Sequence, residues 1–592
     1  MAQIVRNSES LFRIHSFSGL NESPSGDGSL NYGEAAECRN FRVTREGSLQ
    51  VRPGSKTFWK FNGPVEGIWQ GPVGDRTVTV AAADQRLWLL GEPGEVQELG
   101  KIGPGTCRFF GFGQKLYILT GKRYLVWSGY GQVTDVAGYR PVVVVSCPPN
   151  GGGTALEAVN RLNGLRRGFF SPDGSKRVFQ LPEKNLSSVD YVRLRATGEH
   201  LKCTFDLAGG KVTLNSTPST GTNTVEIGWT KGGGSRGEVL RCKCAELYSG
   251  VTDNRVFLYG GGDNRAFYSG IDYDGQATAE YFPEGNVLKA GSDNTPITGM
   301  IRHHSKLLAF KPDGTFSVQV GTTTLESGEE IAAFYLVPLQ REMGSDAVGQ
   351  VTLVDNDPRT LWSGGVYTWR SASSYGSMDE RVGQRISQRV EESLGEMDLS
   401  RAVVFDDEMG REWYVSQGGV TLVHNYSRDC WYRYEGIAPR CFGRIDGQVF
   451  FGTEDGALKR LSREYRNDDG APIHAYWRSG SMSMDKAHRR KWGKYLWVGL
   501  KPESGAAVTV TTRTDQRTSC PVAVARASLM SYTSVNFNHW SYVTNRRPKA
   551  KRVKPWSGPG SFEQVILESD SASGTATVLT LEGTVRLGRY SR

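Results

Sequence analysis

The feature that most constrains the fold is a recurring unit of two short strand-like segments separated by a tight turn. Aromatic and β-branched residues alternate within each segment, and Gly, Asp or Asn occupies the turn, as in a β-hairpin. The clearest units lie at residues 78–90, 109–127, 256–270, 306–320, 361–369, 412–434 and 448–461. With the segment 154–234 set aside, the units recur every ~40–50 residues, which is the size of one propeller blade.

These units predict an all-β chain: an irregular β-propeller with an inserted small β-sandwich and a C-terminal β-sandwich. No unit carries the Trp-Asp or kelch signature, so stacked β-sandwiches remain the alternative. Composition supports many turns, because 73 of the 592 residues are glycine, well above the usual level of about 7%. A mainly helical protein and a large parallel α/β enzyme are both excluded by this pattern.

The length of the chain requires several domains, since single cores stop growing well below this size. Segment 154–234 has longer alternating strands than its surroundings, and Gly-rich stretches at 151–153 and 232–234 bracket it. We therefore expect an extended N-terminal segment that joins the propeller (1–60), the first part of the propeller (61–153), the inserted β-sandwich (154–234), the second part of the propeller (235–471) and the C-terminal β-sandwich with a basic loop (472–592).

One segment has helical periodicity. Val382, Ile386, Val390 and Leu394 recur every four residues between positions 378 and 397. This spacing predicts an amphipathic helix that lies on the neighbouring sheets, and the alternative is a helix that docks a partner.

Positive charge is concentrated in the C-terminal fifth of the chain. The formal net charge is +9, but residues 472–592 contain 19 Lys/Arg against 7 Asp/Glu and carry +12, which leaves the first 471 residues at −3. A basic run of this kind is either a solvated loop or a contact for DNA or an acidic partner. Its members are Arg546, Arg547, Lys549, Lys551, Arg552 and Lys554.

Catalytic and metal-binding patterns are missing from the sequence. It has no nucleophile elbow, phosphate-binding loop, zinc-binding helix or dinucleotide fingerprint. The nine cysteines are spread out and odd in number, so we expect reduced thiols without a disulfide framework. We predict no catalysis, no cofactor and no metal. The chain has no apolar leader or membrane-length apolar run, which predicts synthesis in a cytosol and no membrane insertion.

The opening segment has a distinctive order of short motifs. Gly-Leu-Asn-Glu-Ser begins at Gly19, Arg-Asn-Phe at Arg39, Glu-Gly-Ser-Leu at Glu46 and Arg-Pro-Gly at Arg52. This order is similar to the N-termini of phage tail proteins in which such a leader precedes a β-propeller. The inserted sandwich also resembles small β-domains of phage tail proteins.

The stretch 306–434 resembles the propeller of the packaged-DNA stabilisation family, which forms the tail hub or nozzle of short-tailed phages. The features that carry this likeness are a Thr-rich turn at 320–324, the segments 344–349 and 362–367, the predicted helix, and the aromatic segment 413–434. The likeness lies in the order of these features and not in one sharp motif. The two sandwich domains make this chain larger than a minimal nozzle.

The resemblance implies a structural virion protein in the tail, assembled in the host cytoplasm. Its copies would form a homo-oligomeric ring with sixfold symmetry around a channel for DNA ejection. The ring would connect the portal or adaptor to distal tail proteins. Two alternatives stay open from the residues: a propeller adhesin that binds host-surface glycan, and a propeller enzyme that cleaves glycan with two carboxylates.

Overall fold

The computed structural model of the chain describes residues 9–22, 30–249, 254–324, 330–373, 380–484, 487–503, 505–515, 522–530, 542–555, 558–572 and 574–590. Strands make up nearly all of the regular structure, and each described helix is a single short turn. The predicted fold class is confirmed: the chain is all-β, with a propeller, an inserted sandwich and a C-terminal sandwich. None of the described helices is long and apolar enough to cross a membrane.

Seven four-stranded antiparallel units form the blades of the propeller within the described residues. The strands of blades 1 to 3, innermost first, are β7 (Val65–Val73), β8 (Arg76–Ala83), β9 (Arg86–Leu90) and β10 (Val96–Lys101); β11 (Arg108–Phe112), β12 (Lys115–Leu119), β13 (Tyr124–Trp127) and β14 (Thr134–Asp135); and β23 (Cys244–Tyr248), β24 (Arg255–Tyr259), β25 (Arg265–Tyr268) and β26 (Val287–Lys289).

The remaining blades continue in chain order. Their strands are β27 (Gly299–His303), β28 (Lys306–Lys311), β29 (Gly314–Thr324) and β30 (Glu330–Arg341); β31 (Thr352–Val354), β32 (Asp357–Trp362), β33 (Gly365–Ser373) and β34 (Glu380–Arg385); β35 (Val403–Asp407), β36 (Glu412–Gln417), β37 (Val420–Asn425) and β38 (Cys430–Glu435); and β39 (Cys441–Ile445), β40 (Gln448–Gly452) and β41 (Ala457–Ser462), joined by β6 (Gly54–Lys60).

The ring of blades is closed by a strand from the other end of the chain. β6 pairs antiparallel with β41, from Lys60 opposite Ala457 to Gly54 opposite Ser462. The innermost strand of each blade contacts the innermost strand of the next, and β39 contacts β7. Because blade 7 combines strands from both parts of the sequence, the ring cannot open there without breaking this ladder.

The inserted sandwich lies between blades 2 and 3 and has its own core, which includes Phe170 and Trp229. Its sheets contain β15 (Val142–Cys147), β16 (Thr154–Ala155), β17 (Leu165–Phe170), β19 (Ser188–Leu194) and β22 (Val225–Thr230), and β18 (Val178–Gln180), β20 (Cys203–Asp206) and β21 (Lys211–Leu214). The predicted start at residue 154 is wrong by one strand, because β15 pairs in parallel with β17. The helix α1 (Arg236–Leu240) leads back to the propeller.

The C-terminal sandwich contains strands from both ends of the chain. One sheet holds β1 (Glu9–Ile14), β4 (Phe41–Val43), β5 (Leu49–Val51), β44 (Arg489–Leu500), β47 (Lys549–Val553), β48 (Pro559–Gly560) and β50 (Thr577–Tyr590). The facing layer holds β2 (Gly19–Leu20), β3 (Glu34–Arg39), β43 (Ala471–Ser479), β45 (Ala507–Thr514), β46 (Ala523–Arg526) and β49 (Glu563–Ser571).

The expectation that residues 1–60 form an extended segment joining the propeller therefore needs correction. Only β6 belongs to a blade, whereas β1 pairs with β50 and β3 pairs with β43. The strands of the leader complete both sheets of a sandwich whose other strands lie more than 400 residues later in the chain.

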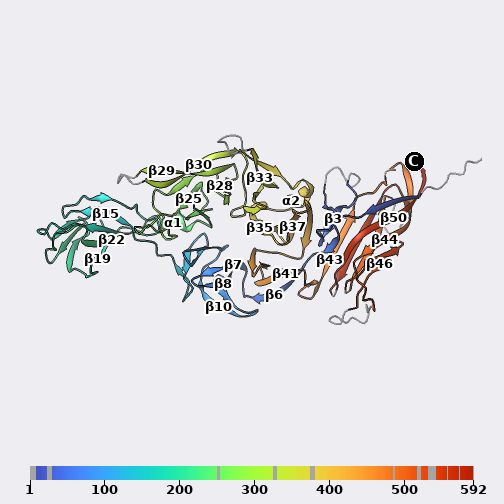
Figure 1. The fold of residues 1–592 in the computed structure, drawn as a ribbon, viewed down its shortest axis with the longest axis horizontal. Helices are drawn as coiled ribbons and strands as arrows, with labels where there is room; N and C mark the ends of the chain where they lie inside the picture. Colours follow the sequence, from blue (N-terminus) through green and yellow to red (C-terminus); the bar gives the residue numbers. More distant parts are fainter. Residues whose placement is uncertain are drawn as a thin grey trace, which may run out of the picture.

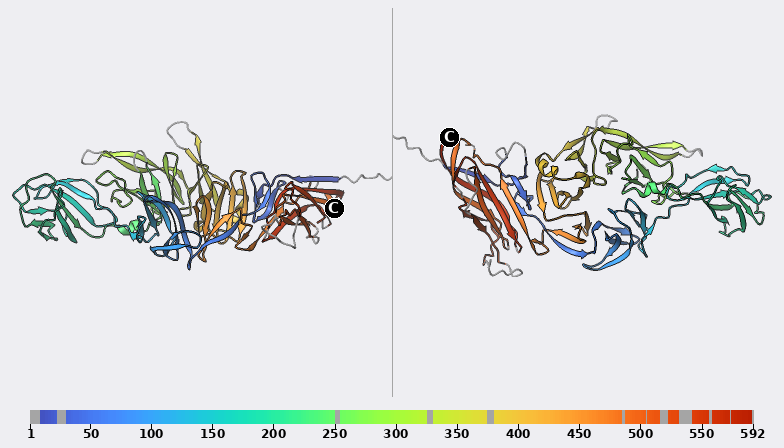
Figure 2. Two further views of the ribbon diagram at one scale, coloured as in Figure 1. Left: turned by 60° about the horizontal axis from the view of Figure 1, so that its bottom comes forward. Right: turned by 180° about the vertical axis from the view of Figure 1, so that it is seen from behind.

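The three parts lie in a row along the longest axis of the molecule. The propeller is central, and the inserted and C-terminal sandwiches lie at opposite ends (Figure 1). The side view in Figure 2 shows the same linear order, with the long hairpins β29–β30 and β33–β34 projecting from one side of the propeller. The chain is therefore an elongated bar.

The predicted amphipathic helix over 378–397 is wrong, and its first two residues lie outside the described part of the chain. Val382 belongs to β34, where 54% of its side chain is exposed. A 3-10 turn (Gln388–Val390) and the helix α2 (Glu391–Gly395) follow. Ile386 is partly buried, and Val390 and Leu394 are fully buried in the core. These four side chains do not form one docking face.

The helix prediction failed because this segment pairs with a neighbouring strand. β34 pairs with β33 over its whole length, with Val382 opposite Arg370 and Gly383 opposite Trp369. A fourfold spacing of apolar residues is local information, and an available partner strand overrides it.

Candidate functional site

The boundary between the propeller and the C-terminal sandwich combines a shared sheet, apolar packing and buried ion pairs. We call this boundary the joint. It is defined by the leader residues 16–22 and 30–54, by β36, β38 and α2 of the propeller, and by β42 (Asn467–Asp468) and β43. β38, the outermost strand of blade 6, pairs with β2 through Leu20 and Trp431. β38 also pairs with β3, which in turn pairs with β43. One sheet therefore runs from the propeller into the sandwich.

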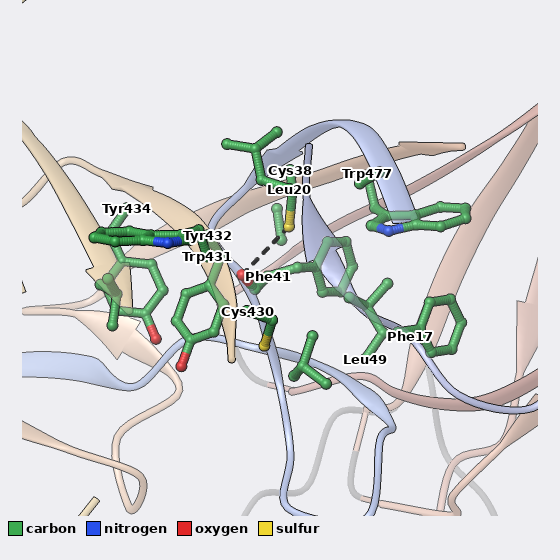
Figure 3. Packing of buried hydrophobic residues seen from close by; sticks show 14 of the residues in the cluster. Phe17, Leu20, Cys38, Phe41, Leu49, Cys430, Trp431, Tyr432, Tyr434 and Trp477 are labelled. Atoms are coloured by element: carbon green, nitrogen blue, oxygen red, sulfur yellow. Dashed lines mark hydrogen bonds between the residues drawn. The ribbon is translucent and has the colours of Figure 1, made fainter. Parts of the chain in front are cut away.

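Apolar packing fills the joint without a break. Figure 3 shows Phe41 between Trp431 and Tyr434 from blade 6 on one side and Phe17 and Trp477 from the sandwich side on the other. The rings of Phe17 and Trp477 meet edge to face with centroids 5.3 Å apart. These residues belong to a single buried cluster that extends across both parts. Burying this much apolar surface stabilises the two parts as one unit.

A buried ion pair crosses the joint. Arg42 on β4 contacts Glu412 on β36 at 2.9 Å, and their side chains are only 4% and 2% exposed. Burial alone disfavours the guanidinium charge, but the carboxylate of Glu412 keeps the pKa of Arg42 above its ordinary value. Arg42 therefore remains charged inside the protein.

Two tyrosine hydroxyls also donate hydrogen bonds to the carboxylate of Glu412. The hydroxyl of Tyr414 donates to it at 2.9 Å and that of Tyr432 at 2.5 Å. Burial raises the pKa of both tyrosines well above the usual value, so both retain the proton that they donate. Three donors on one buried carboxylate hold it in place relative to the leader and to blade 6.

Arg52 is the second ion-pair centre of the joint. Its side chain is 1% exposed, and it binds Asp468 on β42 through both terminal nitrogens, at 2.6 and 3.2 Å. It also donates to the backbone oxygen of Glu435 at 3.0 Å and to the side-chain oxygen of Asn40 at 2.9 Å. Asn40 in turn donates to the backbone oxygen of His474 at 2.8 Å. One guanidinium thus ties the leader to the end of β38 and to β42.

Two glycines of the leader are required by close approach. A Cβ at Gly19, whose φ is +81°, would lie 2.5 Å from the backbone oxygen of Trp431. A Cβ at Gly54 would lie 2.3 Å from the backbone oxygen of Asn467. Glu22 of the same leader accepts hydrogen bonds from the backbone and hydroxyl of Ser393 in α2. The motifs of the leader therefore have their structural explanation in the joint.

Sequence reasoning did not identify the four charged residues of the joint. Arg42 stands between two apolar residues of a strand-like segment, which is a usable signal for a buried charge. Its partner Glu412 and the Asp468 partner of Arg52 are more than 350 residues away in the chain. No pattern in a single sequence pairs residues at that separation.

The predicted basic run lies on β47 and on the residues around it. β47 is the last strand of its sheet and pairs on one side with β44. In the described part of the chain, none of the six basic side chains has a carboxylate within ion-pair distance. Lys549 is half-buried, and the other five side chains are exposed: Arg546, Arg547, Lys551, Arg552 and Lys554.

The strand divides this run between two faces. Lys549 and Lys551 line a cavity of about 460 Å³ together with Arg526, Glu568 and Asp570. Arg552 and Lys554 lie on the other face, 5.0 and 5.2 Å from the centre of the Tyr495 ring. An outer group (Arg546, Arg547, Arg552 and Lys554) is therefore separate from the two lysines of the cavity.

The cysteines and possible metal ligands of the described residues can be compared with the expectations from the sequence. Of the eight cysteines described, all are free and all but Cys203 are buried. Burial raises the pKa of Cys441 and of Cys430 to about 12, which keeps these thiols protonated. The described ranges contain no group of three or more His, Cys, Asp or Glu side chains arranged to hold a metal ion.

No protein-family model matches the sequence, and no curated protein matches it. Several solved structures align with about 70% of the chain at low similarity. A computationally designed protein, Ika8, is 12% identical, with 69% of this chain and 99% of that chain covered and a TM-score of 0.30. The CNH domain of AfRom2 is 9% identical (70% and 99% covered, TM-score 0.32). The WD40 domain of Neurospora crassa Pan2 is 8% identical (70% and 97% covered, TM-score 0.28). These values are too low to transfer any function to this chain.

Proposed function

We propose that this chain is a structural subunit of a phage tail hub or nozzle. The observation that supports this most is the joint. The leader residues that resemble those of phage tail proteins, among them Gly19, Asn40, Arg52 and Gly54, are the residues that fasten the propeller to the sandwich. The resemblance thus falls on positions with a mechanical role in this fold.

The shape and stiffness of the molecule suit a wall segment of a ring. The blades leave few free sheet edges, and a continuous sheet with two buried ion pairs holds the sandwich against them. In our proposal six copies form a homo-oligomeric ring that encloses a DNA channel. The ring joins the portal or adaptor to distal tail proteins in the virion, after assembly in the host cytoplasm. It works without catalysis or a cofactor.

Charge distribution is compatible with passage of DNA. Tight binding of phosphates would oppose release, because each neutralised phosphate adds to the affinity. The first 471 residues carry −3 in total. The outer basic group at β47 is then a contact for an acidic neighbouring subunit or for DNA at the end of the channel.

The test is the assembly state of the purified full-length chain, by native mass spectrometry and electron microscopy, together with mass spectrometry of purified virions. We expect sixfold rings and a virion-associated chain. A chain that stays monomeric at every concentration and is missing from virions would refute the proposal.

A second arm of the experiment examines the outer basic group. Replacing Arg546, Arg547, Arg552 and Lys554 with Gln should weaken ring assembly or DNA retention without unfolding the chain, since all four are exposed. The matched control replaces Lys549 and Lys551, which line the cavity, and should leave assembly unchanged. Equal behaviour of the two variants would exclude the outer group as the contact.

The same preparations distinguish the alternative functions. Exposed tyrosines on the propeller and near the insert come from separate elements: Tyr130 (81% exposed), Tyr273 (38%) and Tyr335 (49%). A glycan adhesin would bind a glycan array saturably as a monomer, and a glycan-cleaving enzyme would hydrolyse host polysaccharide. Either result in a chain that forms no ring would replace our proposal.

A further inference from the structure

The centre of the propeller holds a cavity of about 920 Å³, which we call the central well. It opens among the first residues of the inner strands and the connections that lead into them. Its wall includes Glu66, Arg108, Lys243, Val404 and Arg440, which come from blades 1, 2, 3, 6 and 7. A cavity of this size accommodates a ligand as large as a nucleotide.

The charged groups of the well are mostly cations. Among its lining residues, Arg108, Lys243, Arg401 and Arg440 face a single carboxylate, that of Glu66. Arg440 binds this carboxylate through one nitrogen at 2.7 and 2.9 Å and also pairs with Glu454 outside the well. The charges of Arg440 and Glu66 are therefore already compensated.

The remaining cations lack such compensation. Arg401 is 80% exposed and lies 4.0 Å from its only described ion-pair partner, Asp398. Arg108 and Lys243 have no carboxylate within ion-pair distance in the described part of the chain. Several like charges held in a concave, partly apolar wall concentrate a positive potential there.

The side chain of Arg108 reaches the connection between blades 4 and 5. A Cβ added to Gly349, in the connection to blade 5, would lie 3.4 Å from a terminal nitrogen of Arg108 and 2.5 Å from the sulfur of Cys244. The charge of Arg108 also opposes the rise in pKa that burial causes at Cys244 in blade 3 and at Cys441 in blade 7. The guanidinium thus lies near the connection to blade 5 and near Cys244 of blade 3.

We propose that the central well is a binding site for a phosphate-bearing ligand, held by Arg108 and Lys243. A guanidinium offers paired N–H donors that match two phosphate oxygens, and a lysine adds a point charge. A doubly charged phosphate group suits two or three adjacent cations better than a single carboxylate does. This inference does not depend on ring formation, because all the lining residues come from one chain.

Phosphate can reach the well from two sources, a free polyphosphate or nucleotide and the backbone of a nucleic acid. Isothermal titration calorimetry on the full-length chain with pyrophosphate, with ATP and with a short oligothymidylate separates them. Binding of pyrophosphate and ATP indicates a free ligand, and binding of the oligonucleotide alone indicates nucleic acid. Either outcome supports a phosphate site in the well only where the variants below weaken the binding, since the outer basic group at β47 is also a proposed contact for DNA.

Variants locate the binding. Arg108→Gln with Lys243→Gln should weaken the affinity by about tenfold or more, since hydrogen bonds between charged groups are stronger than neutral ones. The matched control, Lys56→Gln with Lys289→Gln, removes two exposed cations from outer strands and should leave the affinity unchanged. Lys243→Gln alone replaces an exposed side chain, so it folds even if the double variant does not, and it should weaken binding several-fold.

Two results would overturn the proposal. One is that none of the three probes binds at millimolar concentration. The other is that binding persists unchanged in the folded Lys243→Gln variant and in the double variant. Rings that form normally while the well binds nothing would remove this inference and leave the proposed function intact.

Discussion

At the scale of single residues, Arg42 and Glu412 decide whether the joint holds. Both side chains are nearly inaccessible, so removing one partner leaves the other charge buried without compensation. We expect Arg42→Met to lower the free energy of unfolding by about 3–5 kcal/mol, which is the usual cost of breaking a buried pair. Urea unfolding followed by tryptophan fluorescence measures it.

Two controls separate this effect from a general loss of charge. The exposed pair Lys60–Asp455 has side chains that are 56% and 69% accessible, so Lys60→Met should cost less than about 1 kcal/mol. The double variant Arg42→Met with Glu412→Leu removes both charges and should lose less stability than Arg42→Met alone. If Arg42→Met and Lys60→Met have equal effects, the buried pair does not stabilise the joint.

Glu246 makes the folding stability of the propeller depend on pH. It lies on the inner strand β23 and accepts one hydrogen bond from the backbone of Arg302 at 3.2 Å. Burial raises its pKa from 4.5 to about 7. The unfolded chain therefore loses this proton at lower pH than the folded chain, and stability falls as pH rises between these two values.

Glu246→Gln should remove this dependence. At pH 8 we expect the variant to be more stable than the natural chain by about 1–3 kcal/mol, because it has no carboxylate to ionise in a buried position. At pH 4 the group is protonated in both states, and the two proteins should unfold alike. A stability difference that is the same at pH 4 and pH 8 would contradict this explanation.

At the scale of elements, the leader acts as a connector because its backbone comes very close to blade 6. Gly19 combines a positive φ with a Cβ position 2.5 Å from the oxygen of Trp431, whereas Gly470 has a φ of +94° and open space around it. Gly19→Ala should therefore destabilise the joint more than Gly470→Ala, whose cost is about 1 kcal/mol from conformation alone. Differential scanning calorimetry of the two variants tests this, and equal melting temperatures would show that the close approach is unimportant.

The elements that could be predicted from the sequence are those whose partners are local. The blades are hairpins, so strand, turn and strand lie within one short window, as at residues 109–127. β15 was missed because its partner β17 runs parallel to it and is separated from it in the chain by β16. The helix over 378–397 failed although its partner strand is local: the fourfold apolar spacing imitates a helix, whereas pairing with the preceding strand β33 holds β34 extended. The ion pairs of the joint could not be predicted from the sequence, because Arg52 and Asp468 are 416 residues apart.

At the scale of the whole molecule, the two sandwiches differ in how they are attached. The C-terminal sandwich shares a sheet and a core with blades 6 and 7. The inserted sandwich has a separate core, and a loop after β16 returns from it to the propeller. In that loop Leu162 is 1% exposed and packs with Phe282 between blades 2 and 3. One end of the bar is thus continuous with the propeller, and the other is attached by this loop, which we call the anchor, and by side-chain contacts such as that of Phe169 with Tyr273.

Asn160 is the centre of this anchor. Its side chain is fully buried and donates to the backbone oxygens of Tyr139 and Glu280, each at 2.9 Å. It also accepts from the backbone N–H groups of Leu162 at 3.2 Å and Phe282 at 3.0 Å. Asn160→Ala would leave these buried backbone groups without their partner, and we expect a loss of about 2–4 kcal/mol in the stability of the anchor.

This loss should release the inserted sandwich while both cores stay folded. Hydrogen–deuterium exchange should rise in residues 156–163, and small-angle X-ray scattering should show a broader distribution of distances along the bar. Asn215→Ala, an exposed asparagine within the insert, is the matched control and should change neither quantity. If the two variants behave alike, the insert is held by contacts other than Asn160. If only Asn160→Ala responds, the far end of the bar is a separately hinged part, which a ring subunit could orient toward a neighbour.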